Sequence, residues 1–144
     1  MTNHADLAPY IAVHHYGLGD LLHEQARSRP HMIAAIDGFC VAGGLELSLQ
    51  CDIRIAAKDA EVSVSSARFG RKGGSWMAPL ARQMPLGSAL ELALWGDTVW
   101  TAQRAYEVGW VQHVVPGEEL MDCAMEYARR AINMAPQSVR NFKQ

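Results

Sequence analysis

The sequence is poor in cysteine, nearly balanced in charge and free of long apolar runs. Its cysteines, Cys40, Cys51 and Cys123, are odd in number and widely spaced, which fits neither a disulfide framework nor a zinc site and favours a reducing, cytoplasmic setting. The formal net charge of −2 provides no basic surface for nucleic acid. No stretch reaches the roughly 18 apolar residues that a membrane span needs. We therefore expect no nucleic-acid partner, no membrane association and no bound metal.

Residues 33–57 carry the densest group of structural signals in the chain. Residues 33–36 form a short apolar run with β-branched side chains, which is typical of a buried strand. Asp37-Gly38 is a turn dipeptide, Gly43-Gly44 opens a short helix, and residues 52–57 return as a second strand. Paired glycines at the start of a helix allow a ligand to approach the main-chain N–H groups closely. These groups have no acceptor within the helix and lie at the positive end of its dipole.

Spacing alone leaves two interpretations of this helix start open. Amides in this position can hold an anion, or an oxygen that becomes negative during a reaction. Glu46, in the first turn among apolar neighbours, can then act as a general acid or base. Alternatively, the glycines only make a tight connection between strand and helix, and Glu46 only complements the helix dipole.

The motif around this helix start resembles the signature of the crotonase superfamily, also called the enoyl-CoA hydratase/isomerase family. Residues 37–52, DGFCVAGGLELSLQCD, follow the family pattern N-G-x-x-x-G-G-G-x-E-L-x-x-x-C-D, with Asp37 in place of Asn and Ala42 in place of the first of three glycines. Further segments of the chain resemble later parts of the family pattern: 86–97, 101–116 and 135–143. The resemblance therefore covers roughly residues 20–144.

The resemblance implies an α/β fold built as the crotonase-like ββα spiral. Family members are about twice as long, so the chain is expected to lack the N-terminal half and the C-terminal helices of that fold. We expect residues 1–144 to form a single partial domain. Its expected parts are a leading helix in 1–30, the signature and active-site region in 31–70, and a helical C-terminal part in 71–144.

The resemblance also assigns roles to residues of the motif. Gly43 matches the position that supplies one N–H of the family's oxyanion hole, the other coming from the first half of the fold. Glu46 matches the catalytic acid or base. The neighbouring residues expected to bind the substrate are Val41, Ala42 and Gly44.

The position of a second catalytic carboxylate is occupied by a serine. Enoyl-CoA hydratases place a second glutamate about twenty residues after the first, and this position is Ser66 here. A serine hydroxyl keeps its proton at neutral pH, so it cannot serve as a general base unaided. Ser66 is therefore expected either to hydrogen-bond a water or a substrate oxygen in the site, or to be a loop hydroxyl without a role.

The implied function is chemistry on an acyl-CoA thioester through an enolate that the oxyanion hole stabilises. Coenzyme A belongs to the substrate, and no separate cofactor is implied. Hydration, isomerisation, thioester hydrolysis and decarboxylation all remain open. The family also implies a homotrimer or a hexamer. The alternative is a catalytically inactive crotonase-like module for oligomerisation or acyl-CoA binding.

Periodicity predicts further strands and helices. Residues 7–29 are expected to form the leading helix, 61–64 a strand, and 110–115 a strand with His113 on its solvent face. Arg54 is expected on the opposite face of its strand from Ile53 and Ile55.

Later in the chain the apolar pattern follows the helical period over 86–95, 101–109 and 120–133. The residues expected to face the core are Leu86, Ala89, Leu90, Ala93 and Leu94 in the first of these helices, and Met121, Ala124, Met125, Ala128 and Ile132 in the last.

Overall fold

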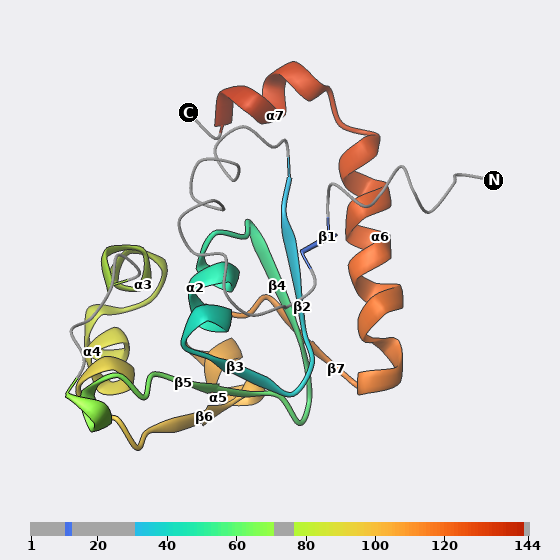
Figure 1. Ribbon diagram of the computed structural model, residues 1–144. Coiled ribbons are helices and arrows are strands. Elements are labelled where there is room, and N and C mark those ends of the chain that lie inside the picture. The colour runs from blue at the N-terminus through green and yellow to red at the C-terminus, as the bar shows by residue number, and fades with distance from the viewer. Residues whose placement is uncertain (1–10, 13–30, 71–76, 143–144) are drawn as a thin grey trace.

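The strands of this protein form two sheets, and helices connect them. The computed structural model describes residues 11–12, 31–70 and 77–142 (Figure 1). Within these residues, a parallel sheet has the strand order β1-β2-β4-β7 and a smaller mixed sheet has the order β3-β5-β6. The strands of the first sheet are β1 (Ile11–Ala12), β2 (Ile33–Ile36), β4 (Ile53–Ala57) and β7 (His113–Val115). Those of the second are β3 (Phe39–Val41), β5 (Glu61–Ser63) and β6 (Val99–Thr101).

Helices fill the connections and cover the sheets. They are α2 (Gly43–Leu49), η3 (Ala67–Phe69), α3 (Met77–Gln83), α4 (Leu86–Leu94), α5 (Ala102–Glu107), η4 (Gly117–Glu119), α6 (Leu120–Ile132) and α7 (Pro136–Phe142). The long helix α6 packs along β2 and β4 on one face of the first sheet (Figure 1). Because helices cover them, these parallel strands are buried and read as apolar runs.

Successive turns of the chain stack on one another. The chain passes from β2 in the first sheet to β3 in the second, continues through α2, and then repeats the passage from β4 to β5. In this repeat β2 pairs parallel with β4 and β3 pairs parallel with β5. The ββα repeat expected from the sequence is therefore present, and the α/β fold class is confirmed.

Most elements predicted around the motif are confirmed, with one omission. Strands β2, β4 and β5, and the start of α2 at Gly43, lie where the pattern places them. The short strand β3 was not expected, because it lies between a turn dipeptide and the paired glycines, where turn signals dominate. It is nevertheless the strand that leads directly into α2.

Two predicted elements need correction. Ile11 and Ala12 form strand β1, which pairs parallel with the start of β2, so the prediction of a helix over 7–29 is wrong at these residues. The remainder of that predicted helix lies outside the described residues. In the segment 110–115, only His113–Val115 is strand, and Trp110 and Val111 are buried in the connection that follows α5.

The predicted buried stripe of α4 is wrong at three of its five positions. Ala89 and Ala93 are buried together with Leu92, which the pattern did not select. The leucines of the predicted stripe face outward in the described structure: Leu86 is 58% exposed, Leu90 38% and Leu94 59%. This helix has apolar residues on more than one side, and periodicity does not decide which side meets the core.

Helix α6 follows its prediction more closely. Ala124, Met125 and Ala128 are buried as expected, whereas Met121 and Ile132, near the two ends, are exposed at 46% and 43%. His113 on the adjoining strand β7 was expected on a solvent face. It is half-buried, and its ring lies against Tyr127 of α6 with a hydrogen bond between Nε2 and the phenol oxygen.

Candidate functional site

The start of α2 presents main-chain amides that have no acceptor within the helix. Ala42 is the N-cap residue, and its carbonyl oxygen accepts the first helical hydrogen bond from Glu46 N at 3.0 Å. The amides of Gly43, Gly44 and Leu45 precede this bond, and the N-cap residue, an alanine, supplies no side-chain cap. Gly44 and Leu45 are buried, whereas Gly43 is exposed. The outermost donor of this helix start is therefore the Gly43 N–H.

The backbone of Ala42 adopts a conformation that suits glycine. Its φ of 51° and ψ of −117° match the first central position of a type II′ turn, which glycine dominates because it has no Cβ. Among the described residues, Ala42 is the only non-glycine with a positive φ. This geometry gives a physical reason for the glycine of the family pattern at this position. Alanine here stores strain on the order of 1–3 kcal/mol.

Gly43, by contrast, is not required by the backbone. Its φ lies outside the left-handed region, and a Cβ built on it meets nothing within 4 Å. The fold therefore has room for a side chain at this position. The effect of glycine is to leave the space in front of the helix start empty.

Glu46 and Ser66 lie beyond the same edge of the second sheet. Glu46 is half-buried in the first turn of α2, which begins directly after β3. Ser66 is half-buried at the N-cap of η3, which follows β5. Because β3 and β5 are parallel neighbours with Val41 beside Ser63, the segments that leave their carboxyl ends emerge side by side. The topology thus brings both predicted site residues to one edge.

A buried cysteine lies beneath α2. The Cys40 Sγ lies 3.5 Å from the Ser48 hydroxyl, which itself donates to the Leu45 carbonyl oxygen at 2.7 Å. Burial raises the pKa of the Cys40 thiol to about 11, against the opposing effects of the Ser48 hydrogen bond and of Arg54. Cys40 is therefore a protonated packing residue at neutral pH rather than a nucleophile.

Arg54 is a contributor to this region that sequence reasoning missed. It lies on the opposite face of β4 from Ile55, as predicted, but this face is also buried, and the guanidinium contacts the end of α2. The available signal was a lone arginine within an apolar strand. A lone arginine in a strand is predicted to face solvent unless the buried acceptors around it are known.

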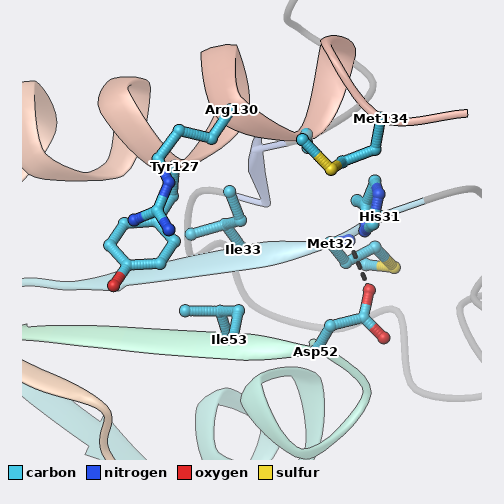
Figure 2. A pocket seen from close by; sticks show the side chains of 9 residues that line it. His31, Met32, Ile33, Asp52, Ile53, Tyr127, Arg130 and Met134 are labelled. Atoms are coloured by element: carbon cyan, nitrogen blue, oxygen red, sulfur yellow. Dashed lines mark hydrogen bonds between the residues drawn. The ribbon is translucent and has the colours of Figure 1, made fainter. Parts of the chain in front are cut away.

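A separate pocket of about 300 Å³ lies between α6 and the amino ends of β2 and β4 (Figure 2). Asp52 Oδ2 accepts a hydrogen bond from Met32 N at 2.7 Å, and the Arg130 guanidinium lies over the Tyr127 ring, 5.0 Å from its centroid. The lining residues are His31, Met32, Ile33, Asp52, Ile53, Tyr127, Arg130, Ala131 and Met134. None of the site residues predicted from the sequence lines this pocket.

Neither a metal centre nor a membrane helix is found in the described part of the chain. Its His, Cys, Asp and Glu residues form no group of three that could hold a metal ion. Among the described helices, none is long and apolar enough to cross a membrane.

Comparison with known proteins shows which family this chain belongs to. A family model for enoyl-CoA hydratase/isomerase matches residues 12–144. The chain belongs to the enoyl-CoA hydratase/isomerase family. The resemblance inferred from the signature motif is thereby confirmed.

Relatives and solved structures agree with this membership. The (E)-benzylidenesuccinyl-CoA hydratase of Thauera aromatica is 36% identical over 122 residues, which cover 80% of this chain and 47% of that protein. The crystal structure of an enoyl-CoA hydratase from Bacillus anthracis is 36% identical with a TM-score of 0.77, over 83% of this chain and 47% of its own. ThnE from S. clavuligerus, at 22% identity, shares the fold, with a TM-score of 0.80 over 92% of this chain and 70% of its own.

This enoyl-CoA hydratase/isomerase family chain spans about half the length of the curated relatives that it matches. The fold that it covers is therefore part of the fold of those relatives. The roles of Gly43, Glu46 and Ser66 remain predictions that rest on the motif and on the geometry of the helix start.

Proposed function

We propose that this chain contributes an acyl-CoA site of the enoyl-CoA hydratase/isomerase type. The observation that carries the proposal is the start of α2, where the family signature places an exposed Gly43 with empty space beside its Cα. In this site the Gly43 N–H donates to the thioester oxygen, and Val41, Ala42 and Gly44 border the acyl group. Coenzyme A is part of the substrate, and no further cofactor takes part.

The chemical step in this proposal is the formation of a thioester enolate. In hydration, a base takes one proton from the water as the water oxygen bonds to Cβ of the unsaturated thioester, and the electron pair of the C=C bond moves toward the carbonyl, whose oxygen becomes negative. A proton then adds to Cα. An N–H aimed at that oxygen stabilises charge that is larger in the transition state than in the substrate, and this difference accelerates the reaction.

Glu46 is the acid or base of the proposed site. It follows Gly43 by three positions, so the two residues share one face of α2. In the proposed site, a thioester whose oxygen contacts the Gly43 N–H has its Cα on the side of the helix where Glu46 lies. This placement suits a carboxyl group that adds or removes the proton at Cα.

Ser66 favours isomerisation over hydration within this family. Hydration uses one group to activate water and another to deliver a proton, or two groups that share both tasks. Isomerisation moves a proton between two carbons of the same chain, and one carboxylate suffices for that transfer. With serine at the second position, Glu46 is the carboxylate on which the proposal relies.

A second candidate function is self-association without turnover, in the trimers or hexamers that the motif resemblance implies. The observation that favours it is the exposed apolar stripe of α4, made by Leu86, Leu90 and Leu94 together with Trp95, which is 60% exposed. Exposed apolar surface of this kind is typical of interaction sites, and in this second candidate a further copy of the chain covers it. Sedimentation equilibrium of the wild type and of Leu90→Glu tests this candidate, because a charge on the stripe should shift an oligomer toward the monomer.

The experiment that tests the acyl-CoA site compares the wild type with Gly43→Ala. The fold accepts a methyl group at this position, so the melting temperature should stay the same. The methyl group occupies the space that the thioester needs, so affinity for acetoacetyl-CoA should fall at least about tenfold. Equal affinity of the two proteins would show that no ligand approaches Gly43.

A further inference from the structure

Arg54 is a charged side chain buried beneath α2. It lies in β4 and is 6% exposed. Its Nε donates to the Trp110 carbonyl oxygen at 2.7 Å, and its Nη1 donates to the carbonyl oxygens of Ser48 at 3.0 Å and Cys51 at 2.8 Å. The guanidinium also lies over the Trp110 ring, 5.4 Å from the centroid. Burying such a group is costly unless hydrogen bonds of this kind satisfy it.

Of these acceptors, Ser48 lies in the last turn of α2 and Cys51 directly follows its C-cap residue, Gln50. The last carbonyl oxygens of a helix have no donor within the helix and carry its partial negative charge. The last turn of α2 contains no basic residue of its own. Arg54 therefore supplies the positive charge and the donors for this end from the neighbouring strand.

The third acceptor of the Arg54 guanidinium, the Trp110 carbonyl oxygen, is held firmly in place. Gln112 accepts a hydrogen bond from Arg54 N at 2.8 Å through its Oε1 and donates through its Nε2 to the Trp110 carbonyl oxygen at 3.0 Å. Gln112 N donates in turn to the Arg54 carbonyl oxygen at 2.9 Å. Trp110 is fully buried. The guanidinium thus joins the end of α2 to a part of the core that is itself fixed by several bonds.

We propose that Arg54 is a positioning residue that holds α2 in the orientation required by the acyl-CoA site. α2 is a rigid rod of about 10 Å, so a tilt at its carboxyl end displaces Gly43 and Glu46 at its amino end. Misplacement of reacting groups by about 1 Å can lower a rate by two orders of magnitude. The effect on ligand binding rests on the proposed function, whereas the anchoring of α2 rests on the contacts of Arg54 alone.

The test uses Arg54→Met, Arg54→Lys and a matched control. Methionine fills much of the space but donates nothing, and lysine keeps the charge without the planar set of donors. The control is Arg104→Met, because Arg104 also lies over a tryptophan, 5.5 Å from the Trp100 centroid, and hydrogen-bonds Glu91 rather than α2. Each variant is measured at the same interval below its own melting temperature, which removes differences in global stability.

Hydrogen exchange and acetoacetyl-CoA affinity are the readouts. We expect Arg54→Met to speed exchange of the α2 amides at least tenfold relative to those of α4 and to weaken acetoacetyl-CoA binding at least tenfold. In both readouts, the values for Arg54→Lys should lie between those of Arg54→Met and the wild type. If Arg54→Met does not fold, Arg54→Lys is the variant that tests the proposal. Arg104→Met should change neither readout.

The outcomes separate this inference from the function on which it rests. If the wild type binds acetoacetyl-CoA and Arg54→Met binds it equally well with α2 equally protected, the positioning role is overturned. If the wild type binds no thioester but Arg54→Met still loosens α2, the proposed function fails and the anchoring of α2 by Arg54 stands.

Discussion

Gly96 lies directly against the main chain of Arg68. A Cβ built on Gly96 would lie 2.4 Å from Arg68 N and 2.9 Å from Arg68 Cα. Arg68 belongs to η3, whose N-cap residue is Ser66, and Gly96 follows α4. The end of α4 therefore packs closely on the segment that carries one of the predicted site residues.

This contact predicts that Gly96→Ala destabilises the protein. The clash is with backbone atoms, which cannot move aside as the end of a flexible side chain can, so we expect a loss of about 1–3 kcal/mol in the free energy of unfolding. Urea denaturation measures the loss. Gly87→Ala is the matched control, because a Cβ on Gly87 in α4 meets nothing within 4 Å. Equal stability of the two variants would contradict the close packing of Gly96 on η3.

The positive φ of Ala42 predicts that Ala42→Gly stabilises the fold. Glycine relieves the strain at this N-cap but gains more freedom in the unfolded chain, which costs roughly 0.5–1 kcal/mol. We expect a net gain of about 1 kcal/mol, seen as a higher urea midpoint with an unchanged slope. A variant less stable than the wild type would show that the backbone at Ala42 is not strained.

The buried Cys40 thiol predicts a loss of stability at high pH. Its pKa is about 11 in the folded protein, against 9.0 for an ordinary cysteine. Between these values the unfolded chain releases the proton and the folded protein keeps it, so rising pH favours unfolding. The contribution is fully present below pH 9.0 and is lost as the pH rises through about 11, a total on the order of 2–3 kcal/mol.

Cys40→Ala isolates this contribution from those of other groups. The variant lacks the thiol, so its free energy of unfolding should fall less between about pH 8 and pH 11 than that of the wild type. Because each protein is compared with itself at the two pH values, a difference between variant and wild type that is already present at pH 8 does not affect the result. Parallel pH profiles for the two proteins would contradict a raised pKa at Cys40.

The assignment of Glu46 predicts that Glu46→Gln lowers turnover of an acyl-CoA substrate at least about tenfold, or about 1.4 kcal/mol in the barrier. The amide has nearly the same shape but cannot transfer the proton, so acetoacetyl-CoA affinity should change little. The measurement compares turnover and affinity on the same preparations. Unchanged turnover would remove Glu46 from the proposed chemistry.

The serine at position 66 predicts that Ser66→Glu raises the hydration of crotonyl-CoA. The variant places a carboxylate at the sheet edge that Glu46 already shares, and two carboxylates can divide the activation of water and the delivery of the proton. The loss of the enoyl absorbance reports hydration, with Ser66→Gln as the uncharged control. A rate no higher than that of Ser66→Gln would show that the missing carboxylate does not limit hydration.

Local patterns were sufficient for most of the region around the motif, strand β3 excepted. The apolar run of β2, the paired glycines of α2 and the glutamate in its first turn are decided by neighbours a few residues away. The motif spacing therefore located both the helix start and its candidate residues. The strain at Ala42 could not be predicted from the sequence. The turn between β3 and α2 imposes the positive φ at this position, and the alanine itself gives no sign of it.

Contacts between distant parts of the chain were beyond such patterns. Arg54 donates to the carbonyl oxygen of Trp110, 56 residues away, and only the folded topology brings this acceptor to the end of α2. The outward stripe of α4 has the same cause. Its leucines and its alanines are both apolar, and the choice between them depends on which neighbouring elements pack against the helix.

The proposed function depends on one claim, that this chain binds an acyl-CoA thioester at the start of α2. The most direct measurement is the melting temperature of the wild type during titration with acetoacetyl-CoA, with free coenzyme A as the control. At about one hundred times its dissociation constant the thioester should add about 2.7 kcal/mol to the free energy of unfolding, and free coenzyme A should add less. A melting temperature that does not change with any CoA thioester would contradict the claim and favour the self-associating module.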